Sequence, residues 1–224
     1  PIALQVEAEV HACADAQALL AFVQGKARVA IWMDANALQF ATDADHVASL
    51  PIQQTLLDMD GVTPREALLT AARVLGDPNV EKIVYDAKQW AHALAEEEAT
   101  LCEPCEDCML LQYVDDSAKG QWGLQRQCEA AGFIGPDEAP NAAHLWRLYE
   151  KLSDTTRKEG TYAVYGDIER PLWRVLFAME RRGFRVDLQQ LKQSSEAYGE
   201  RLQQIEAEVV EMAGHPFNLN STKQ

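Results

Sequence analysis

Short apolar runs alternate with polar turns over the first half of the chain, and these runs predict strands. Three runs lie close together, at residues 29–33, 37–41 and 47–52, and turns that contain Asp or Asn separate them. A fourth run occupies residues 82–85, and a fifth short strand is expected near residues 99–102. Short apolar runs between turn-forming residues are typical of β-strands.

Four helices are predicted around these strands. One lies near the N-terminus and is capped by Asp15. The next begins at Thr63, where Glu66 completes a capping box. The other two follow Asp86 and Asp107, which are suitable N-cap residues. The order helix, three strands, helix, strand, helix, strand, helix predicts an α/β fold, a mixed sheet with helices on both faces.

Beyond residue 120 the apolar spacing is that of helices. A short helix is expected around Leu124, followed by a loop, and a longer helix is expected over residues 141–152. Residues 153–160 are polar, and we interpret them as a linker. The α/β domain is therefore predicted to cover residues 1–160.

Two amphipathic helices are predicted after this linker. The first covers residues 167–182 and is closed by Gly183. The second is long; it starts after Asp187 and ends at Gly214. Residues 161–224 are therefore predicted to form an all-α segment.

The composition is that of a globular protein, with 47% hydrophobic and 25% charged residues. No apolar run approaches the length of roughly 18 residues that a membrane span needs, and the start resembles no signal peptide. Five cysteines form an odd set, which favours a reducing compartment. We expect a cytoplasmic monomer that does not bind membranes.

The net charge of −15 is confined to the first part of the chain. Residues 1–140 contain 8 Lys and Arg against 23 Asp and Glu, which gives −15, whereas residues 141–224 contain 12 of each and are neutral. A strongly negative surface repels nucleic acid unless metal ions or a basic groove offset it. The first part is therefore a poor candidate for DNA binding, and the second part is permissive.

Three sequence blocks in the second part resemble the opening of the polymerase domain in family A DNA polymerases, the DNA polymerase I group. They are DIERPL at 167–172, MERRGFRVD at 179–187 and AGHPFNLNSTKQ at 213–224. Three ordered blocks are more specific than a single short motif. The resemblance implies that the long helix leads into the thumb, which grips primer–template DNA. It also implies that the polymerase active site and its magnesium ions belong to a polymerase domain beyond residue 224.

The same resemblance suggests DNA contacts at the end of the chain. Asn220, Ser221, Thr222 and Lys223 would lie near the DNA backbone. Amide, hydroxyl and ammonium groups of this kind position a duplex through its phosphates without reading its sequence. The alternative is that this short segment only packs against the base of the thumb.

The first part resembles the 3′–5′ exonuclease domain of the same family, which has a ribonuclease-H-like fold. Such an exonuclease uses four carboxylates around two divalent metal ions. The first two form an Asp-x-Glu pair at the end of the first strand. Here Met33, Asp34 and Ala35 occupy that place, or Asp34, Ala35 and Asn36 if the alignment shifts by one residue. The pair is broken in either case.

The other two carboxylate positions are also altered. In the helix after the fourth strand, Asp86 holds the place of an Asn, and Trp90 holds that of the third carboxylate. The fourth comes from a Tyr-x-x-x-Asp pattern, and Asp137 and Asn141 occupy those two places. Because at most one of four carboxylates remains, we predict no catalytic residues and no metal in this segment. The leading hypothesis is an inactive exonuclease-like scaffold, and the alternative is an active exonuclease with displaced ligands.

A third hypothesis rests on cysteine spacing. Cys102, Cys105 and Cys108 form a Cys-x2-Cys-x2-Cys run. This run resembles part of an iron–sulfur motif, but the fourth ligand and a second zinc-type pair are missing from the sequence nearby. A metal-binding interaction module therefore stays open, and ordinary buried thiols are the preferred interpretation.

Overall fold

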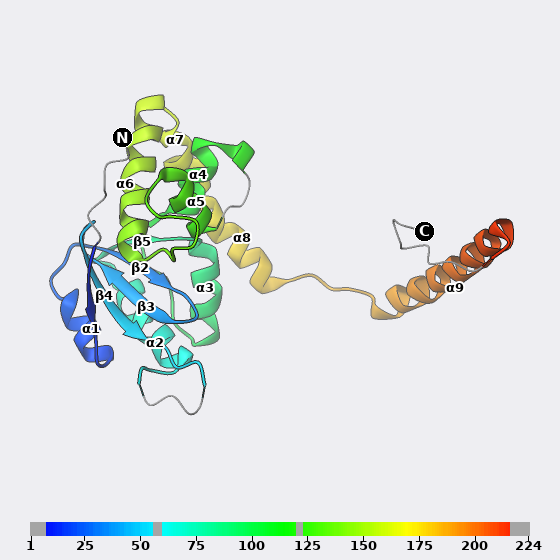
Figure 1. Ribbon diagram of the computed structural model, residues 1–224, viewed down its shortest axis with the longest axis horizontal. Coiled ribbons are helices and arrows are strands. Elements are labelled where there is room, and N and C mark those ends of the chain that lie inside the picture. Colours follow the sequence, from blue (N-terminus) through cyan, green and yellow to red (C-terminus); the bar gives the residue numbers. More distant parts are fainter. Residues whose placement is uncertain (1–7, 56–59, 120–122, 216–224) are drawn as a thin grey trace. The chain divides into compact units, whose positions relative to one another are not determined.

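The computed structural model describes residues 8–55, 60–119 and 123–215 of the chain. Its contacts divide it into two compact units, residues 1–181 and residues 182–224. The first unit contains the whole sheet, and the second contains one long helix (Figure 1).

A six-stranded mixed sheet forms the centre of the first unit, with strand order β1-β4-β3-β2-β5-β6. Strands β2, β3 and β4 form an antiparallel meander, whereas β1 pairs parallel with β4, and β5 and β6 extend the other edge in parallel from β2. The strands are β1 (Glu9–Ala12), β2 (Arg28–Met33), β3 (Ala37–Ala41), β4 (His46–Pro51), β5 (Glu81–Val84) and β6 (Cys105–Asp107).

Helices cover both faces of this sheet, so the predicted mixed α/β class is confirmed. Helices α1, α2 and α3 share one hydrophobic core, and α4, α5 and α6 share the other. Alternate side chains of β2 face opposite sides of the sheet. Val29 and Ile31 belong to the first core and Ala30 belongs to the second. The helices are α1 (Ala16–Phe22), α2 (Pro64–Leu75), α3 (Ala87–Glu96), α4 (Cys108–Asp115), α5 (Leu124–Ala131) and α6 (Ala142–Glu159).

Local capping chemistry explains where these helices start. Asp15 accepts a hydrogen bond from the backbone N–H of Ala18 at 2.8 Å. The predicted capping box of α2 is present, because Thr63 accepts from the N–H of Glu66 and the Glu66 carboxylate accepts from that of Thr63. Each such cap satisfies an amide that the first helical turn leaves without a partner.

The structure corrects the strand prediction in two places. The fifth strand is not near residues 99–102; it is β6, at Cys105–Asp107. Strand β1 was not predicted, because all four of its residues are exposed and so lack an apolar alternation. Its place is set by parallel pairing with β4, a contact that local periodicity does not reveal.

The predicted linker at residues 153–160 is also wrong. These residues continue α6 to Glu159, and Gly160 ends the helix with a φ of +78°. Ser153 and Thr156 are buried in spite of their polarity. The Thr156 hydroxyl donates to the Leu152 carbonyl at 2.8 Å, so its polar group is satisfied within the helix.

The predicted helix over residues 167–182 is observed with an irregular start. Helix α7 (Tyr162–Val164) passes into a π-helical segment, η2 (Tyr165–Glu169), and then into α8 (Arg170–Arg182). The π-helical segment ends two residues before Pro171, which has no N–H to donate to an α-helical ladder. Because the first unit extends to residue 181, the functional division at residue 160 stays a prediction.

The second unit contains helix α9 (Leu188–Ala213). Asp187 caps it and accepts from the N–H groups of Gln189 and Gln190, each at 3.0 Å. Gly214 ends it with a φ of +74°, a conformation that favours glycine. None of the described helices is long and apolar enough to cross a membrane.

Candidate functional site

Two of the predicted site positions follow neighbouring parallel strands. Asp34 comes directly after β2 and Asp86 shortly after β5, and these strands are parallel partners. The carboxyl ends of parallel strands meet at the same edge of a sheet, so the fold brings both residues to one edge. Beside Asp34, Met33 is half-buried against the first core and Ala35 is exposed.

Asp34 is a turn residue. One of its carboxylate oxygens accepts from the N–H of Asn36 at 2.7 Å and from that of Ala37 at 3.0 Å. Its own N–H donates to the Ala37 carbonyl, which closes the hairpin between β2 and β3. Such side-chain-to-backbone bonds are typical of tight turns. The Asp34 carboxylate therefore stabilises the hairpin.

Asp86 has a similar structural role. Its backbone is left-handed, with φ 60° and ψ 73°, and its side chain caps α3 by accepting from the N–H of Gln89 at 3.0 Å. A non-glycine residue in this region is uncommon and is favoured in Asp and Asn. One turn later, Trp90 is 7% exposed and packs in the first core. An indole offers no oxygen to a hard cation.

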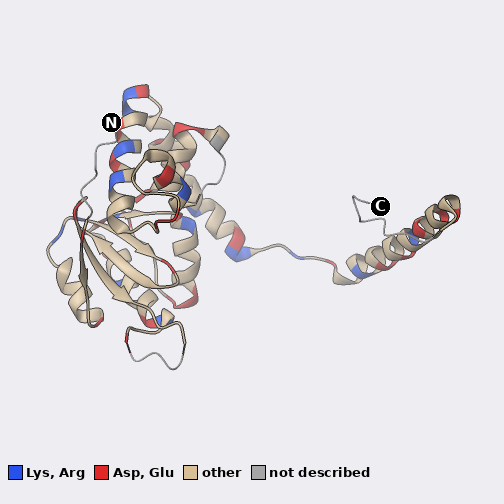
Figure 2. Cartoon of the chain, in the orientation of Figure 1, with Lys and Arg blue, Asp and Glu red and all other residues tan. Residues whose placement is uncertain are grey.

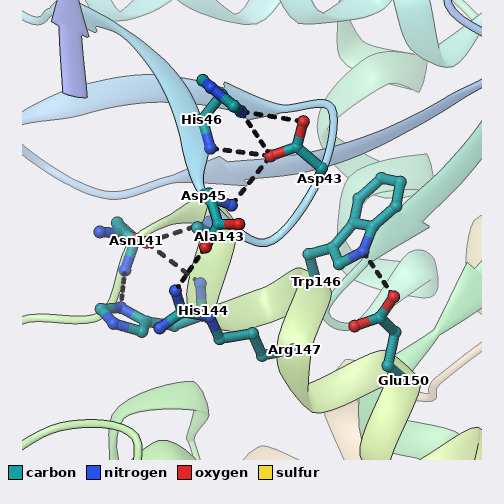
Figure 3. A network of polar contacts seen from close by, with 9 residues as sticks. All are labelled: Asp43, Asp45, His46, Asn141, Ala143, His144, Trp146, Arg147 and Glu150. Atoms are coloured by element: carbon teal, nitrogen blue, oxygen red, sulfur yellow. Dashed lines mark hydrogen bonds and ion pairs between the residues drawn. The ribbon is translucent and has the colours of Figure 1, made fainter. Parts of the chain in front are cut away.

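Asn141 is the N-cap of α6. Its side-chain oxygen accepts from the N–H groups of Ala143 at 3.0 Å and His144 at 3.1 Å (Figure 3). Its own N–H donates to Nδ1 of His144. Burial lowers the pKa of His144, which keeps the ring neutral and Nδ1 able to accept. Asp137, four residues earlier, is exposed in the loop before the helix.

Two contacts fix this end of α6 beside the sheet. The N–H of Ala142 donates to Oε1 of Gln39 in β3 at 3.2 Å. Arg147 donates to Asp45 in the turn between β3 and β4, the turn in which Asp43 binds His46 (Figure 3). Asn141 therefore lies near the β2–β3 hairpin that contains Asp34.

The residues at these positions do not fit a two-metal site. Asp34, Asp86 and Asn141 each use a side-chain oxygen for backbone amides, and Trp90 is buried in a hydrophobic core. Among the described residues there is no group of three or more His, Cys, Asp or Glu side chains that could hold a metal ion. Magnesium needs several oxygen ligands in a near-octahedral arrangement. These side chains therefore do not support a metal-dependent step.

Sequence reasoning identified Asp107 only as a helix cap, and it missed a second role. Asp107 caps α4 by accepting from the N–H of Met109 at 2.9 Å. It also accepts from the N–H groups of Asp86 at 3.1 Å and Ala87 at 2.7 Å, at the start of α3. Burial raises its pKa to about 6, although these three hydrogen bonds oppose the shift in part. A single carboxylate therefore holds the N-termini of two helices.

A buried polar chain continues from Asp107 to the DIERPL block. The N–H of Asp107 donates to the Tyr165 hydroxyl at 2.9 Å, and that hydroxyl donates to Glu106 at 2.8 Å. Arg170 donates to the other Glu106 oxygen at 2.7 Å. Burial raises the pKa of Glu106, and Tyr165 and Arg170 oppose this rise. The arginine of the block therefore neutralises a buried carboxylate, a role that only the position of β6 reveals.

The ion pairs Arg170–Glu106 and Arg174–Glu103 allow a matched comparison of two arginine variants. The Glu106 side chain is 5% exposed, whereas Glu103, the partner of Arg174, is 36% exposed. Breaking a buried pair leaves an uncompensated charge, and breaking an exposed pair has little effect. We expect Arg170→Ala to lower the free energy of unfolding by about 2 kcal/mol, with allowance for the partial exposure of Arg170. For Arg174→Ala we expect less than about 1 kcal/mol.

Urea unfolding followed by circular dichroism measures both values. The double variant Arg170→Ala/Glu106→Gln serves as a further control, and it should lose less than Arg170→Ala alone because the buried charge is gone. Equal losses for Arg170→Ala and Arg174→Ala would contradict this assignment of the buried pair.

The three clustered cysteines do not converge. Cys105 in β6 packs in the first core, and Cys108 at the start of α4 packs in the second, on the other face of the sheet. Cys102 lies before β6 and is half-buried. Burial raises the pKa of Cys105 and Cys108 well above the usual thiol value, which disfavours the thiolate form that binds metals. Sulfurs on opposite faces of a sheet do not fit a shared metal ion.

The predicted DNA contacts, Asn220, Ser221, Thr222 and Lys223, lie outside the described residues.

Comparisons with known proteins agree on one group of relatives, although no family model matches the chain. DNA polymerase I of Bacillus caldotenax is 32% identical over 173 residues, which is 67% of this chain and 20% of that protein. The thermostable DNA polymerase I of Thermus aquaticus is 34% identical over 167 residues, 70% of this chain and 20% of that protein. The corresponding enzyme of Thermus filiformis is 36% identical over 132 residues, 58% of this chain and 16% of that protein.

A solved structure has the same fold. It is the POL domain of Pol1 from M. smegmatis in complex with DNA primer-template and dNTP, with a TM-score of 0.66 and 20% sequence identity. The superposition covers 95% of this chain and 39% of that chain. The matched region thus spans a fifth or less of the sequence relatives and under half of the solved chain. The chain is therefore a homologue of part of bacterial DNA polymerase I.

Proposed function

We propose that this chain is a structural, non-catalytic segment of a DNA-directed DNA polymerase that acts in DNA replication and repair synthesis. Residues 1–160 serve as an exonuclease-like scaffold, and residues 161–224 support the thumb of the polymerase domain. Primer–template DNA and the rest of the polymerase domain are the partners, and magnesium acts in that domain. The protein works as a cytoplasmic monomer.

One observation carries the proposal of an inactive scaffold. The positions that an exonuclease would fill with metal-binding carboxylates hold a hairpin-turn aspartate, a helix-capping asparagine and a buried tryptophan. Two-metal catalysis of phosphodiester cleavage depends on oxygen donors that fix both cations. Removal of several such donors removes the site, and the remaining polar side chains are used for folding.

We expect no metal-dependent degradation of a single-stranded oligonucleotide by the purified chain. The assay follows a 5′-labelled 20-residue oligonucleotide with magnesium or manganese, and samples with EDTA give the background. An active 3′–5′ exonuclease on the same substrate is the positive control. Shortening from the 3′ end that requires the metal would overturn the scaffold proposal and favour displaced ligands.

We expect the end of the chain to contribute to duplex binding. Lys223→Ala should weaken binding to duplexes of different sequence by the same factor and lower the slope of log K against log salt by about 1, since one phosphate contact is lost. Fluorescence anisotropy at several salt concentrations measures both quantities. Lys192→Ala, on the exposed start of α9, is the control. An unchanged slope for Lys223→Ala would support simple packing of this segment.

A further inference from the structure

A groove lies between α1 and α2 on the first unit. It has a volume of about 970 Å³ and is open to solvent along the two helices. Apolar side chains from both helices form its floor, and Leu20 and Leu69 are the largest that stay partly exposed. Leu69 is 38% exposed. Side chains of this kind in a concave surface can anchor another apolar group.

Carboxylates surround this apolar floor. Asp15 lies at the start of α1, Glu66 in the first turn of α2, and Asp77 after the end of α2. Arg73 is the single cation among the described lining residues. The formal charge of the lining is therefore −3 + 1 = −2. Hydrogen bonds from Thr63 lower the pKa of Glu66, which keeps this carboxylate ionised.

Each carboxylate has one oxygen left for a further donor. Asp15 uses Oδ1 for the N–H of Ala18, Glu66 uses Oε2 for Thr63, and Asp77 uses Oδ1 for Asn79. Their second oxygens accept no hydrogen bond from another described residue. An ionised carboxylate can accept more than one hydrogen bond, so each can still bind an ammonium or guanidinium group.

We propose that this groove, lined by α1 and α2, is a docking site for a cationic amphipathic segment of a partner protein. Its leucine or aromatic side chain would cover Leu20 and Leu69, and its Lys and Arg side chains would bind the free oxygens of the three carboxylates. Nucleic acid and anionic membranes do not fit, because residues 1–140, which include the groove, carry a net charge of −15. Figure 2 marks the Asp and Glu residues in red and the Lys and Arg residues in blue along the ribbon. This site is separate from the exonuclease-like positions and does not depend on the proposed function.

The test uses the whole 224-residue chain and a fluorescein-labelled, 14-residue helical peptide of Lys and Leu as the probe. We expect saturable binding in anisotropy titrations at physiological salt. Leu69→Asn should weaken it by about tenfold or more, because a buried leucine contact is lost. Leu172→Asn on α8 is the matched control, since Leu172 is also 38% exposed, and it should have no effect.

Charge is tested separately. Gln17→Lys/Gln24→Lys places two cations on the groove without touching a cap, and it should weaken binding several-fold. Gln203→Lys on α9 is the control. Unfolding midpoints show that each variant is folded. The proposal is overturned if the peptide does not bind, if Leu69→Asn and Leu172→Asn bind it equally, or if an analogue with Glu in place of Lys binds as well.

Discussion

Trp90→Asp is expected to lower the free energy of unfolding by about 4 kcal/mol and to produce no nuclease activity. The indole is 7% exposed and packs in the first core, so its removal leaves a large cavity, which typically costs 3–5 kcal/mol. The new carboxylate would also lie in the apolar surroundings of the first core. The substitution restores one carboxylate of the exonuclease pattern, and destabilisation should nevertheless be the main result.

The effect of magnesium on the stability of this variant tests whether a metal site remains. Urea unfolding with and without 10 mM magnesium is compared for the original chain, Trp90→Asp and Trp90→Phe. Trp90→Phe should lose only about 1–2 kcal/mol because it keeps most of the apolar volume. A bound cation would stabilise the folded state through mass action. If magnesium raised the unfolding midpoint of Trp90→Asp alone, the carboxylates at this edge would still form a metal site.

Asp107→Ala is expected to lower the free energy of unfolding by about 3 kcal/mol at pH 7. It leaves the N–H groups of Asp86, Ala87 and Met109 without their acceptor, and each buried unsatisfied group costs about 1–3 kcal/mol. Loss of the buried charge offsets part of this cost. Asp107→Asn keeps an acceptor oxygen, and we expect a smaller loss.

The same residue predicts a pH dependence. The folded state holds the proton of Asp107 up to about pH 6, whereas the unfolded state releases it near the ordinary pKa of 3.8. Between these values the folded state binds more protons, so this group makes the free energy of unfolding fall as pH rises from about 4 to about 6. At full ionisation the loss is about 3 kcal/mol.

The contribution of Asp107 is measured by comparing the free energies of unfolding of the original chain and of Asp107→Asn at pH 5 and pH 7. The difference between the two proteins should be greater at pH 5, where the original chain has regained part of the stability. An NMR titration of the Asp107 carboxyl carbon gives its pKa directly. A midpoint near 4 would contradict the proposed cost of burial.

Part of the candidate site could be predicted from the sequence. The departures from the exonuclease carboxylate pattern around residue 34 and at residues 90 and 141 can be predicted from the sequence, because they depend only on residue types at aligned positions. One side-chain oxygen each of Asp34, Asp86 and Asn141 accepts from backbone amides within three residues, as the turn and cap signals indicate. The second role of Asp107 was not predictable in this way, because its partners lie about twenty residues earlier.

The sequence by itself determined the starts of α2, α3 and α9 and the presence of the three strands β2, β3 and β4. Caps and tight turns act over three or four residues, so Thr63, Asp86 and Asp187 mark their helices without knowledge of the rest of the fold. Only the tertiary structure decided the parallel pairing of β1 with β4 and the place of β6. It also decided that Cys105 and Cys108 lie in different cores and that Arg170 neutralises Glu106. The physical reason is that these features depend on residues that are distant along the chain or lie on opposite faces of the sheet. Such features form only when the assembled fold buries these residues, so local sequence patterns do not indicate them.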